Sequence, residues 1–281
     1  MQPIDTLERH TTKHLAQDFV NAALAKHIGD SDERNWRLLT FPAKQCNYER
    51  SLLSSPLGKN IKDIIGLEAK PDVARVSKRN ARKLHSCFRK TRFSVFHTTD
   101  YHFWQPANLG GSKNDNLRGN AGLGQGFDMI WLDWMQCWSK GTRNSLSAMA
   151  QNIDVFERAW AQQRPGLLFI TLCVGGIGER KVELEHLAHA MWDMDLPADP
   201  CTNNPIELAR LRFQGVAAWL NQHTRAEGAD CIPVSAIQYR EPGAHCQPMM
   251  LMGFDVKIST LSRAAIADRI EKIKIRRGFE T

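Results

Sequence analysis

Short apolar runs alternate along this chain with longer segments in which apolar residues recur three or four positions apart. Runs of this length bounded by turn residues are typical of buried strands, and the longer period is typical of amphipathic helices. The pattern predicts five strands along the chain before residue 173. These are Arg37–Phe41, Lys62–Leu67, Phe93–His97, Phe127–Leu132 and Leu167–Leu172.

Helices are expected around these strands, where the helical period is bounded by caps, glycine or proline. The expected helical segments are 1 to about 30, 47–57, 71–84, 145–163, 181–192 and 204–224. The chain then predicts a β-hairpin, with strands at Cys231–Tyr239 and Met249–Ile258 around the turn Glu241-Pro242-Gly243. Residues 263–277 mix apolar and basic side chains, which is typical of an exposed helix or extension.

The expected strands end about 25 to 40 residues apart, at Ala43, Glu68, Asp100, Asp133 and Cys173. Such intervals suit βαβ units, which take about 30 residues each. We therefore predict a doubly wound α/β fold. Its mostly parallel seven-stranded sheet would end in a C-terminal antiparallel hairpin and carry helices on both faces. The expected organisation is a helical extension (1–35), a Rossmann-like domain (36–258) and a basic tail (259–281).

Composition narrows the class of protein. The chain has 281 residues, 42% hydrophobic and 24% charged, and a net charge of +7, which favours an anionic partner. Its seven cysteines form no C-x-x-C pair, so we expect no structural zinc and a reducing compartment. No signal-peptide core and no membrane-length apolar run is present. These features predict a cytoplasmic protein without a membrane partner, and they leave its oligomeric state open.

Basic residues dominate the segment from Arg75 to Arg92, which contains no acid. Four of them share one helical face, namely Arg75, Arg79, Arg82 and Lys83. One interpretation is a patch that contacts the phosphates of a nucleic acid. The other is an ordinary solvated helix face.

A glycine- and asparagine-rich stretch, 108–126, can bury little surface and is expected to be a mobile loop or lid. It contains Gly122-x-Gly124-x-Gly126, but a strand follows this motif. A phosphate-binding glycine loop must instead follow a strand and open a helix. Gly175, Gly176 and Gly178 do stand between a strand and a helix, and we interpret them as a tight turn.

The order of these pieces resembles the class I Rossmann-like S-adenosylmethionine-dependent methyltransferases, which have five βα units and then a hairpin. The resemblance covers residues 36–258 and rests on Glu68 and Asp100 at the ends of strands two and three. It rests also on the block FDMIWLDW (127–134) at strand four. The blocks RPGLLFIT (164–171) and MMLMGF (249–254) support it.

The resemblance implies a role for several residues and S-adenosylmethionine as the cofactor. Glu68 would accept hydrogen bonds from the ribose hydroxyls. Asp100 would accept from the adenine amine, and Tyr101 would stack on the adenine ring. Asp133 would lie between the sulfonium and the substrate and either orient the acceptor atom or act as the base.

The chain departs from the family after its first strand, where the glycine-rich loop is replaced by FPAKQCN (41–47). Phe41, Pro42 and Ala43 would line the methionine end of the cofactor, although Pro42 offers no backbone N–H. Ala43 is small enough to permit a close approach. Glu49 would bind the methionine amino group, or it is simply a first-turn acid favoured by the helix dipole.

The methyl acceptor is left open by the sequence. The motif Asp133-Trp134-Met135-Gln136 lacks the prolines of many base-amine methyltransferases, and Cys137 follows Gln136 rather than proline. Trp134 and Trp138 either stack on a base or pack in the core.

Three functions are compatible with these residues. The first is a methyltransferase acting on nucleic acid. The second is a catalytically degenerate relative that binds nucleic acid or a protein. The third is a nicotinamide dinucleotide enzyme, which is disfavoured because the first turn has no glycines to admit a pyrophosphate.

Overall fold

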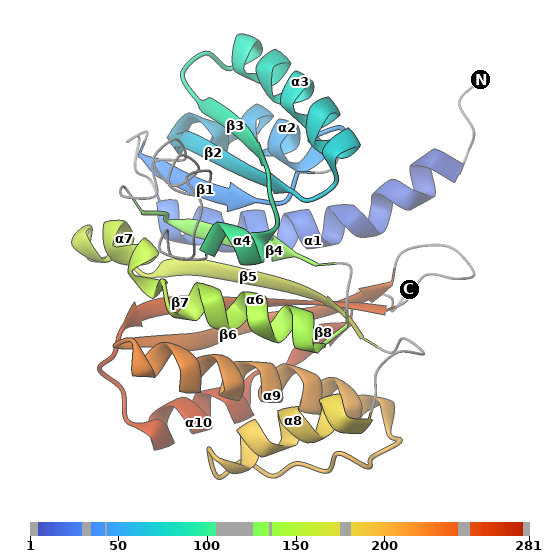
Figure 1. Ribbon diagram of the computed structural model, residues 1–281, viewed down its shortest axis with the longest axis vertical. Coiled ribbons are helices and arrows are strands. Elements are labelled where there is room, and N and C mark those ends of the chain that lie inside the picture. The colour runs from blue at the N-terminus through green and yellow to red at the C-terminus, as the bar shows by residue number, and fades with distance from the viewer. Residues whose placement is uncertain are drawn as a thin grey trace. The chain divides into compact units, whose positions relative to one another are not determined.

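The computed structural model describes residues 5–29, 35–42, 44–104, 126–134, 137–174, 181–240 and 248–277. Its strands are β1 (Trp36–Thr40), β2 (Ile61–Glu68), β3 (Arg92–His97), β4 (Met129–Asp133), β5 (Gly166–Cys173), β6 (Ala229–Arg240), β7 (Pro248–Ile258) and β8 (Ile275–Arg277). Its α-helices are α1 (Asp5–Ile28), α2 (Asn47–Ser54), α3 (Pro71–Cys87), α4 (Asp100–Trp104), α6 (Lys140–Ala150), α7 (Glu157–Ala161), α8 (Lys181–Trp192), α9 (Pro205–Ala226) and α10 (Arg263–Lys272), shown in Figure 1. Within the described residues, the 3₁₀ helices are η1 (Pro56–Asn60) and η3 (Ile153–Phe156).

The strands form a sheet in the order β3-β2-β1-β4-β5-β7-β6-β8. β1 pairs in parallel with β2 and β4, and β2 pairs in parallel with β3. β6 and β7 form the antiparallel hairpin. The predicted fold class is therefore confirmed, and the order is compatible with the class I methyltransferase resemblance. The short strand β8, parallel to β6, adds an eighth strand to the seven expected.

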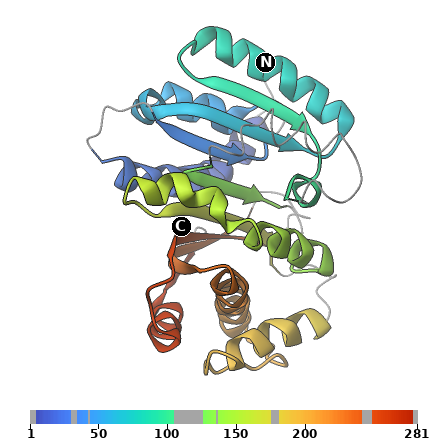
Figure 2. The ribbon, with the colours of Figure 1, turned by 60° about the vertical axis from the view of Figure 1, so that its left-hand side comes forward.

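The chain divides into two compact units. One consists of residues 21–133 and 152–168 and contains β1 to β4. All five residues of β1 are buried, as expected for a parallel strand covered on both faces. α3 buries the small residues Ala74, Ser77 and Ala81 with Leu84, and through this face it packs on β2 and β3 (Figures 1 and 2). Its opposite face is left to charged side chains.

The amino-terminal edge of this parallel sheet holds a buried ion network. Arg37, in the middle of an apolar strand, is 0% exposed and donates from Nε to Asp63 Oδ2 at 2.9 Å. Arg92 Nε donates to the other carboxylate oxygen of Asp63 at 2.8 Å. Burial lowers the pKa of Arg37, and its hydrogen bond to Asp63 opposes that shift. The hydrogen bond to Asp63 therefore offsets part of the cost of burying the Arg37 guanidinium.

A second buried carboxylate, Asp128, connects the start of β4 by hydrogen bonds to β1, to α7 and to the residues before β5. It accepts from the Arg37 backbone N–H at 2.8 Å, from Arg158 Nε at 3.1 Å and from Arg164 at 2.7 Å. Because two guanidinium groups and a backbone donor satisfy it, this buried charge is compensated.

The other unit consists of residues 1–20, 134–151 and 169–281. Its hairpin pairs Ala229 with Ile258 at one end and Arg240 with Pro248 at the other. The register shifts just after Pro233, because proline has no N–H for the ladder and is tolerated at such an irregularity. α9 packs on β6 and on α8.

Three expectations are refined by the structure. The single helix predicted over 145–163 is wrong: α6 begins at Lys140 and ends at Ala150, and η3 and α7 follow. The earlier start comes from a capping box between Ser139 and Thr142. Residues 259–277 contain α10 and β8. Trp134 and Trp138 are buried, so core packing accounts for both.

Several predicted segments lie outside the described residues. These are most of the glycine-rich stretch 108–126, the glycines 175–178 and the turn 241–243. Among the residues that are described, no helix is long and apolar enough to cross a membrane. The same residues contain no group of three or more His, Cys, Asp or Glu side chains arranged to hold a metal.

Candidate functional site

The carboxyl ends of β1 to β4 lie side by side at one edge of the first unit. The strand registers pair Thr40 with Gly66, Leu39 with Ile130 and Glu68 with His97. Continuing them by two or three residues brings four positions into one row, namely Pro42, Glu68, His97 and Asp133. Neighbouring strands are about 4.8 Å apart, so Glu68 and Asp133 stand roughly 10 Å apart across β1. In open α/β sheets this edge is where ligands bind.

Glu68 is the last residue of β2 and is partly exposed. The Lys70 backbone N–H donates to its Oε1 at 2.8 Å. This bond orients the carboxylate, and the second oxygen has no partner within the described part of the chain. Glu68 can therefore cap the β2–α3 turn and still accept hydrogen bonds from a ligand.

The turn after β1 contains no glycine, yet it packs closely against β2. Pro42 packs over Gly66, and a Cβ built on Gly66 would lie 2.6 Å from Pro42 Cγ and 3.2 Å from Val95 Cγ2. The glycine that permits this close approach is therefore Gly66 of β2, and not a residue of the turn itself. Ala43, which completes the predicted turn, lies outside the described residues.

We expect Gly66→Ala to destabilise the protein by about 1–3 kcal/mol, because the added methyl group overpacks this contact. A urea titration measures the change in the free energy of unfolding. Gly141→Ala is the matched control, since a Cβ there meets only Ser139 Oγ at 3.6 Å. The control should stabilise α6 by up to about 1 kcal/mol. A Gly66→Ala protein as stable as the control would contradict the close contact.

Glu49 lies in the first turn of α2 and is only 2% exposed. Its Oε1 accepts a hydrogen bond from the Thr40 hydroxyl at 2.8 Å. Since Thr40 is the last residue of β1, this bond places the Glu49 carboxylate next to the end of that strand. The burial suits the first-turn acid, and the ligand contact that the sequence left open stays a prediction.

The neighbours of Glu49, Cys46 and Tyr48, are buried, and burial makes both side chains unreactive. Burial and, to a smaller extent, the negative charge of Glu49 raise the pKa of Cys46 to about 12. The thiol is therefore protonated at neutral pH and is a poor nucleophile. Burial likewise raises the pKa of Tyr48, whose ring meets the Trp131 ring edge-on at 4.7 Å.

The remaining predicted residues follow β3 and β4. Asp100 begins α4, whose start is capped by Thr99, and its side chain lies outside the described part. Tyr101, the next residue, is 38% exposed, and its ring centroid lies 5.8 Å from that of His102. Asp133 ends β4 and is half-buried. Phe41, half-buried, and Pro42, buried, come directly after β1.

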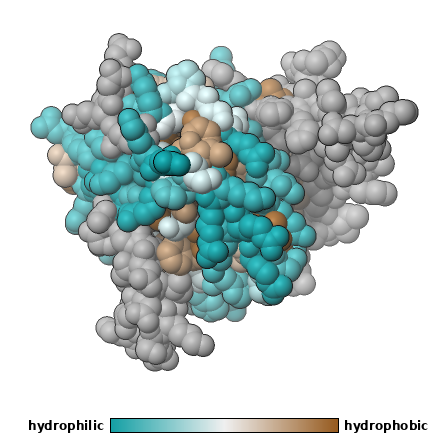
Figure 3. All heavy atoms as spheres, turned by 90° about the horizontal axis from the view of Figure 1, so that it is seen from above, coloured by the Kyte–Doolittle hydropathy of each residue, from teal (hydrophilic) through white to brown (hydrophobic). Residues whose placement is uncertain are grey.

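The four basic residues predicted to share a face of α3 are all exposed. Lys78 is exposed on the same helix, and none of the five forms an ion pair with a described residue. Figure 3 looks onto the end of the protein where α3 lies and shows mostly hydrophilic side chains with a few apolar ones between them. The opposite, buried face of α3 holds it against the sheet.

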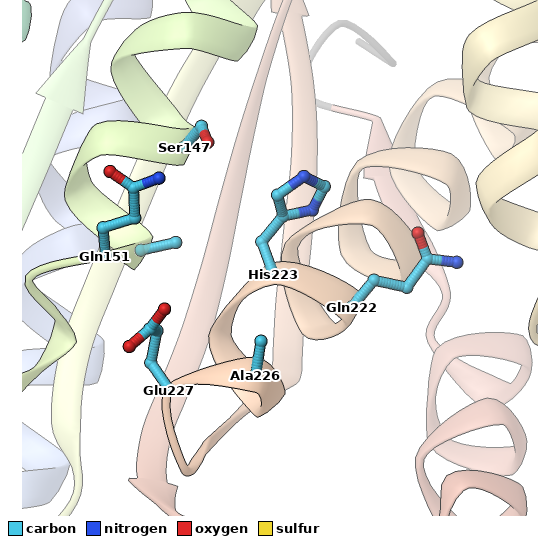
Figure 4. A pocket seen from close by; sticks show the side chains of 7 residues that line it. Ser147, Gln151, Gln222, His223, Ala226 and Glu227 are labelled. Atoms are coloured by element: carbon cyan, nitrogen blue, oxygen red, sulfur yellow. The ribbon is translucent and has the colours of Figure 1, made fainter.

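The second unit contains a polar cavity that was not predicted from the sequence. It has a volume of about 250 Å³ and lies between α6 and the end of α9. Figure 4 shows Ser147 and Gln151 facing His223 across it, with Glu227 below, whereas Gln222 points away. Residues 147–151 and 222–227 are distant in the chain, so no spacing pattern links them.

His223 in this cavity is held by its own helix. Its ring stacks on Trp219, with centroids 3.7 Å apart, and its Nδ1 donates to the Trp219 carbonyl at 2.8 Å. Gln222 donates to the Ala190 carbonyl at 3.1 Å. These contacts give both side chains a structural role.

No family model and no curated protein matches the sequence. Solved structures with similar folds include Trm1 from Pyrococcus horikoshii in complex with S-adenosyl-L-methionine. That match has 9% identity and a TM-score of 0.49, and it covers 91% of this chain and 57% of Trm1. Another is TYW2 from M. jannaschii in complex with AdoMet, at 9% identity and a TM-score of 0.38, covering 85% of this chain and 76% of TYW2. The fold class rests on the strand order above, and the chemistry rests on this chain's own residues.

Proposed function

We propose that this protein is an S-adenosylmethionine-dependent methyltransferase that acts on nucleic acid. The observation that carries the proposal is the row of positions at the carboxyl edge of β1 to β4, with Glu68 and Asp133 two strands apart. Glu68 keeps one carboxylate oxygen for a ligand, and the turn at Pro42 lies between the two acids in this row.

The charges at this edge support a cationic ligand. Glu49, Glu68, Asp100 and Asp133 all lie at or just beyond the ends of β1 to β4 or in the turn of helix beside them. S-adenosylmethionine carries a sulfonium and an ammonium against one carboxylate, so it suits such an edge. A dinucleotide pyrophosphate would be repelled by the same acids, which argues against a nicotinamide enzyme.

The donor set also fits the cofactor group by group. The free oxygen of Glu68 accepts from ribose hydroxyls, and a carboxylate at Asp100 accepts from the adenine amine. The Glu49 carboxylate next to Thr40 suits the ammonium of the methionine part. Tyr101 offers a ring for stacking. The close contact of Pro42 with Gly66 allows the backbone after β1 to stay near the ligand without a glycine loop.

In the proposed mechanism the protein chiefly positions the two reactants. When bound, the cofactor supplies a methyl group on a sulfonium that is already reactive. Asp133, at the end of β4, holds the acceptor atom in line or takes its proton. Glu68 and Tyr101 fix the adenosine part, so that the methyl group stays aligned with Asp133.

Nucleic acid is the proposed substrate class because of the exposed basic face of α3. This helix begins at Pro71, three residues after Glu68, so its cations extend from the proposed cofactor edge. Exposed arginine and lysine side chains in a row, without an ion pair to any described residue, suit a phosphate backbone.

A second candidate function is favoured by one observation at the first turn. Pro42 has no N–H and is packed against Gly66, so this turn offers a ligand fewer backbone donors than a glycine loop does. The corresponding protein would bind nucleic acid or a protein partner and would have lost catalysis.

Calorimetric titration with S-adenosylmethionine and S-adenosylhomocysteine distinguishes the two candidates. We expect micromolar binding by the wild-type protein. Glu68→Ala should weaken it roughly 10- to 100-fold, because a hydrogen bond to a charged group contributes about 1.5–3 kcal/mol. Glu207→Ala, which removes an exposed carboxylate on α9, is the control and should bind like wild type.

Each outcome of the titration has a clear meaning. Binding that is lost in Glu68→Ala alone supports the cofactor site and justifies a search for the acceptor in pooled RNA and DNA. A folded wild-type protein that binds neither ligand would rule out the methyltransferase and leave the binding protein. Equal affinity in Glu68→Ala and wild type would refute the ribose contact.

A further inference from the structure

A basic cavity opens at the amino-terminal edge of β2 and β3, at the opposite ends of these strands from the proposed cofactor site. Its volume is about 340 Å³, at the lower end of the roughly 300–1,000 Å³ typical of ligand pockets. Its lining comes from the starts of two strands, the last turn of α3 and the turn that follows α3. The lining residues are Lys62, Asp63, His85, Arg89, Lys90 and Arg92.

The only acid in this lining is already neutralised. Both carboxylate oxygens of Asp63 are occupied, by Arg37 at 2.9 Å and by Arg92 at 2.8 Å, and its side chain is 2% exposed. Asp63 therefore contributes no free negative charge to the cavity. It acts instead as an anchor that holds the Arg92 guanidinium in place.

The cations around the cavity remain available. Arg92 holds Asp63 through Nε only, and its side chain is 59% exposed. Its terminal nitrogens bind no acid among the described residues, and Lys62, Arg89 and Lys90 are exposed without an ion pair there. Four positive charges around one opening repel each other. A bound anion would reduce this electrostatic repulsion, so the cavity favours anion binding.

His85 is the fifth nitrogen-bearing side chain in the lining. Its Nδ1 donates to the Thr91 carbonyl at 2.8 Å, which fixes the ring between α3 and β3. With the proton on Nδ1, Nε2 of the neutral ring is a hydrogen-bond acceptor, so it suits a ligand hydroxyl or N–H rather than a phosphate oxygen.

The cavity continues the basic face of α3. This helix has 17 residues and is therefore about 25 Å long. It starts just after Glu68 at one edge of the sheet and ends at His85 and Cys87, next to the cavity. Exposed cations thus extend from the proposed cofactor edge to the opposite edge.

We propose that this cavity anchors a backbone phosphate of the nucleic-acid substrate, about one α3 length from the methyl-transfer site. A small phosphorylated ligand would need only the cavity, whereas a polymer also accounts for the unpaired cations along α3. Phosphates of one strand are spaced about 3.4 Å along a duplex, so roughly seven nucleotides span the helix. The inference rests on nucleic acid being the substrate class.

The test replaces Arg89 and Lys90 by glutamine in the full-length chain. Both side chains are exposed and unpaired in the described structure, so folding should be unaffected, as a thermal melt will verify. The probes are fluorescent RNA and DNA of roughly 20 nucleotides, whose affinities are measured across a salt series. Losing this one phosphate contact lowers the magnitude of the slope of log affinity against log salt by about 0.7 for a single strand.

The control carries the same loss of charge elsewhere. Lys181→Gln with Lys272→Gln removes two exposed lysines of the other unit, each paired with an acid four residues away. We expect the wild-type slope in this control and the lower slope in the cavity variant. Equal slopes in cavity variant and wild type, or equal falls in both variants, would overturn the proposal.

The cofactor titration separates this inference from the proposed function. The cavity variant should bind S-adenosylhomocysteine as wild type does, because Arg89 and Lys90 lie at the other edge of the sheet. A wild type that binds nucleic acid through the cavity but no cofactor would refute the methyltransferase and leave the anchor standing. Loss of cofactor affinity in the cavity variant would overturn the separation of the two sites.

Discussion

Asp63→Ala should lower the free energy of unfolding by about 3–5 kcal/mol, the usual cost of removing one partner of a buried ion pair. The variant leaves the guanidinium of Arg37, which is 0% exposed, without its carboxylate. Arg37 would then remain charged in the core with the Gly126 carbonyl still accepting from Nη1. A carbonyl offers only a partial charge, so the desolvation of the guanidinium is no longer offset.

A urea titration followed by fluorescence measures this change. The control is Asp72→Ala, which removes an acid of the same unit from an exposed pair with Lys44. Exposed pairs contribute about 0–1 kcal/mol, so the control should stay close to wild type. If Asp63→Ala were no less stable than Asp72→Ala, the network at the amino edge would not be a main support of the sheet.

Asp133→Asn should slow methyl transfer by roughly 10²- to 10⁴-fold, the range over which a positioned acid or base contributes. The asparagine keeps the shape of the side chain and one oxygen acceptor, but it loses the charge and the ability to take a proton. S-adenosylhomocysteine affinity should be unchanged, because the cofactor is held mainly by the residues after β1 to β3. Transfer of labelled methyl groups to pooled RNA and DNA measures the rate.

The pH dependence of the residual rate separates the two roles left to Asp133. If Asp133 acts as the base, the variant should lose the acidic limb of the plot of rate against pH. If Asp133 only orients the acceptor atom, the rate should fall by the same factor at every pH. Asp72→Ala again serves as the control and should transfer methyl groups at the wild-type rate. An Asp133→Asn protein with full activity would remove Asp133 from the mechanism.

The parallel half of the fold was foreseeable because its strands are continuous apolar runs. Leu38 and Leu39 in β1, and Ile64 and Ile65 in β2, are buried as such runs predict. Glu68 and Asp133 could be placed at strand ends because each is the first charged residue after such a run. The register between strands then put both in one row.

Other features depend on long-range contacts that no local pattern reveals. Arg37 and Asp63 look like ordinary polar residues of two strands, and only the pairing of β1 with β2 makes them partners. The three residues of β8 are too few to show a period. The early start of α6 at Lys140 depends on a capping box at Ser139 that lies ahead of the apolar pattern used for the prediction.

The strand order has a consequence for self-association. β3 and β8 are the outermost strands, and outer strands offer unpaired backbone groups to the strands of another molecule. β3 opens with the exposed Arg92, and β8 is a three-residue strand with two arginines. Short or positively charged borders discourage such pairing. Positive charge on the edge strands β3 and β8 therefore also opposes edge-to-edge aggregation of this protein. Salt screens this charge, so added salt would reduce the repulsion at both edges.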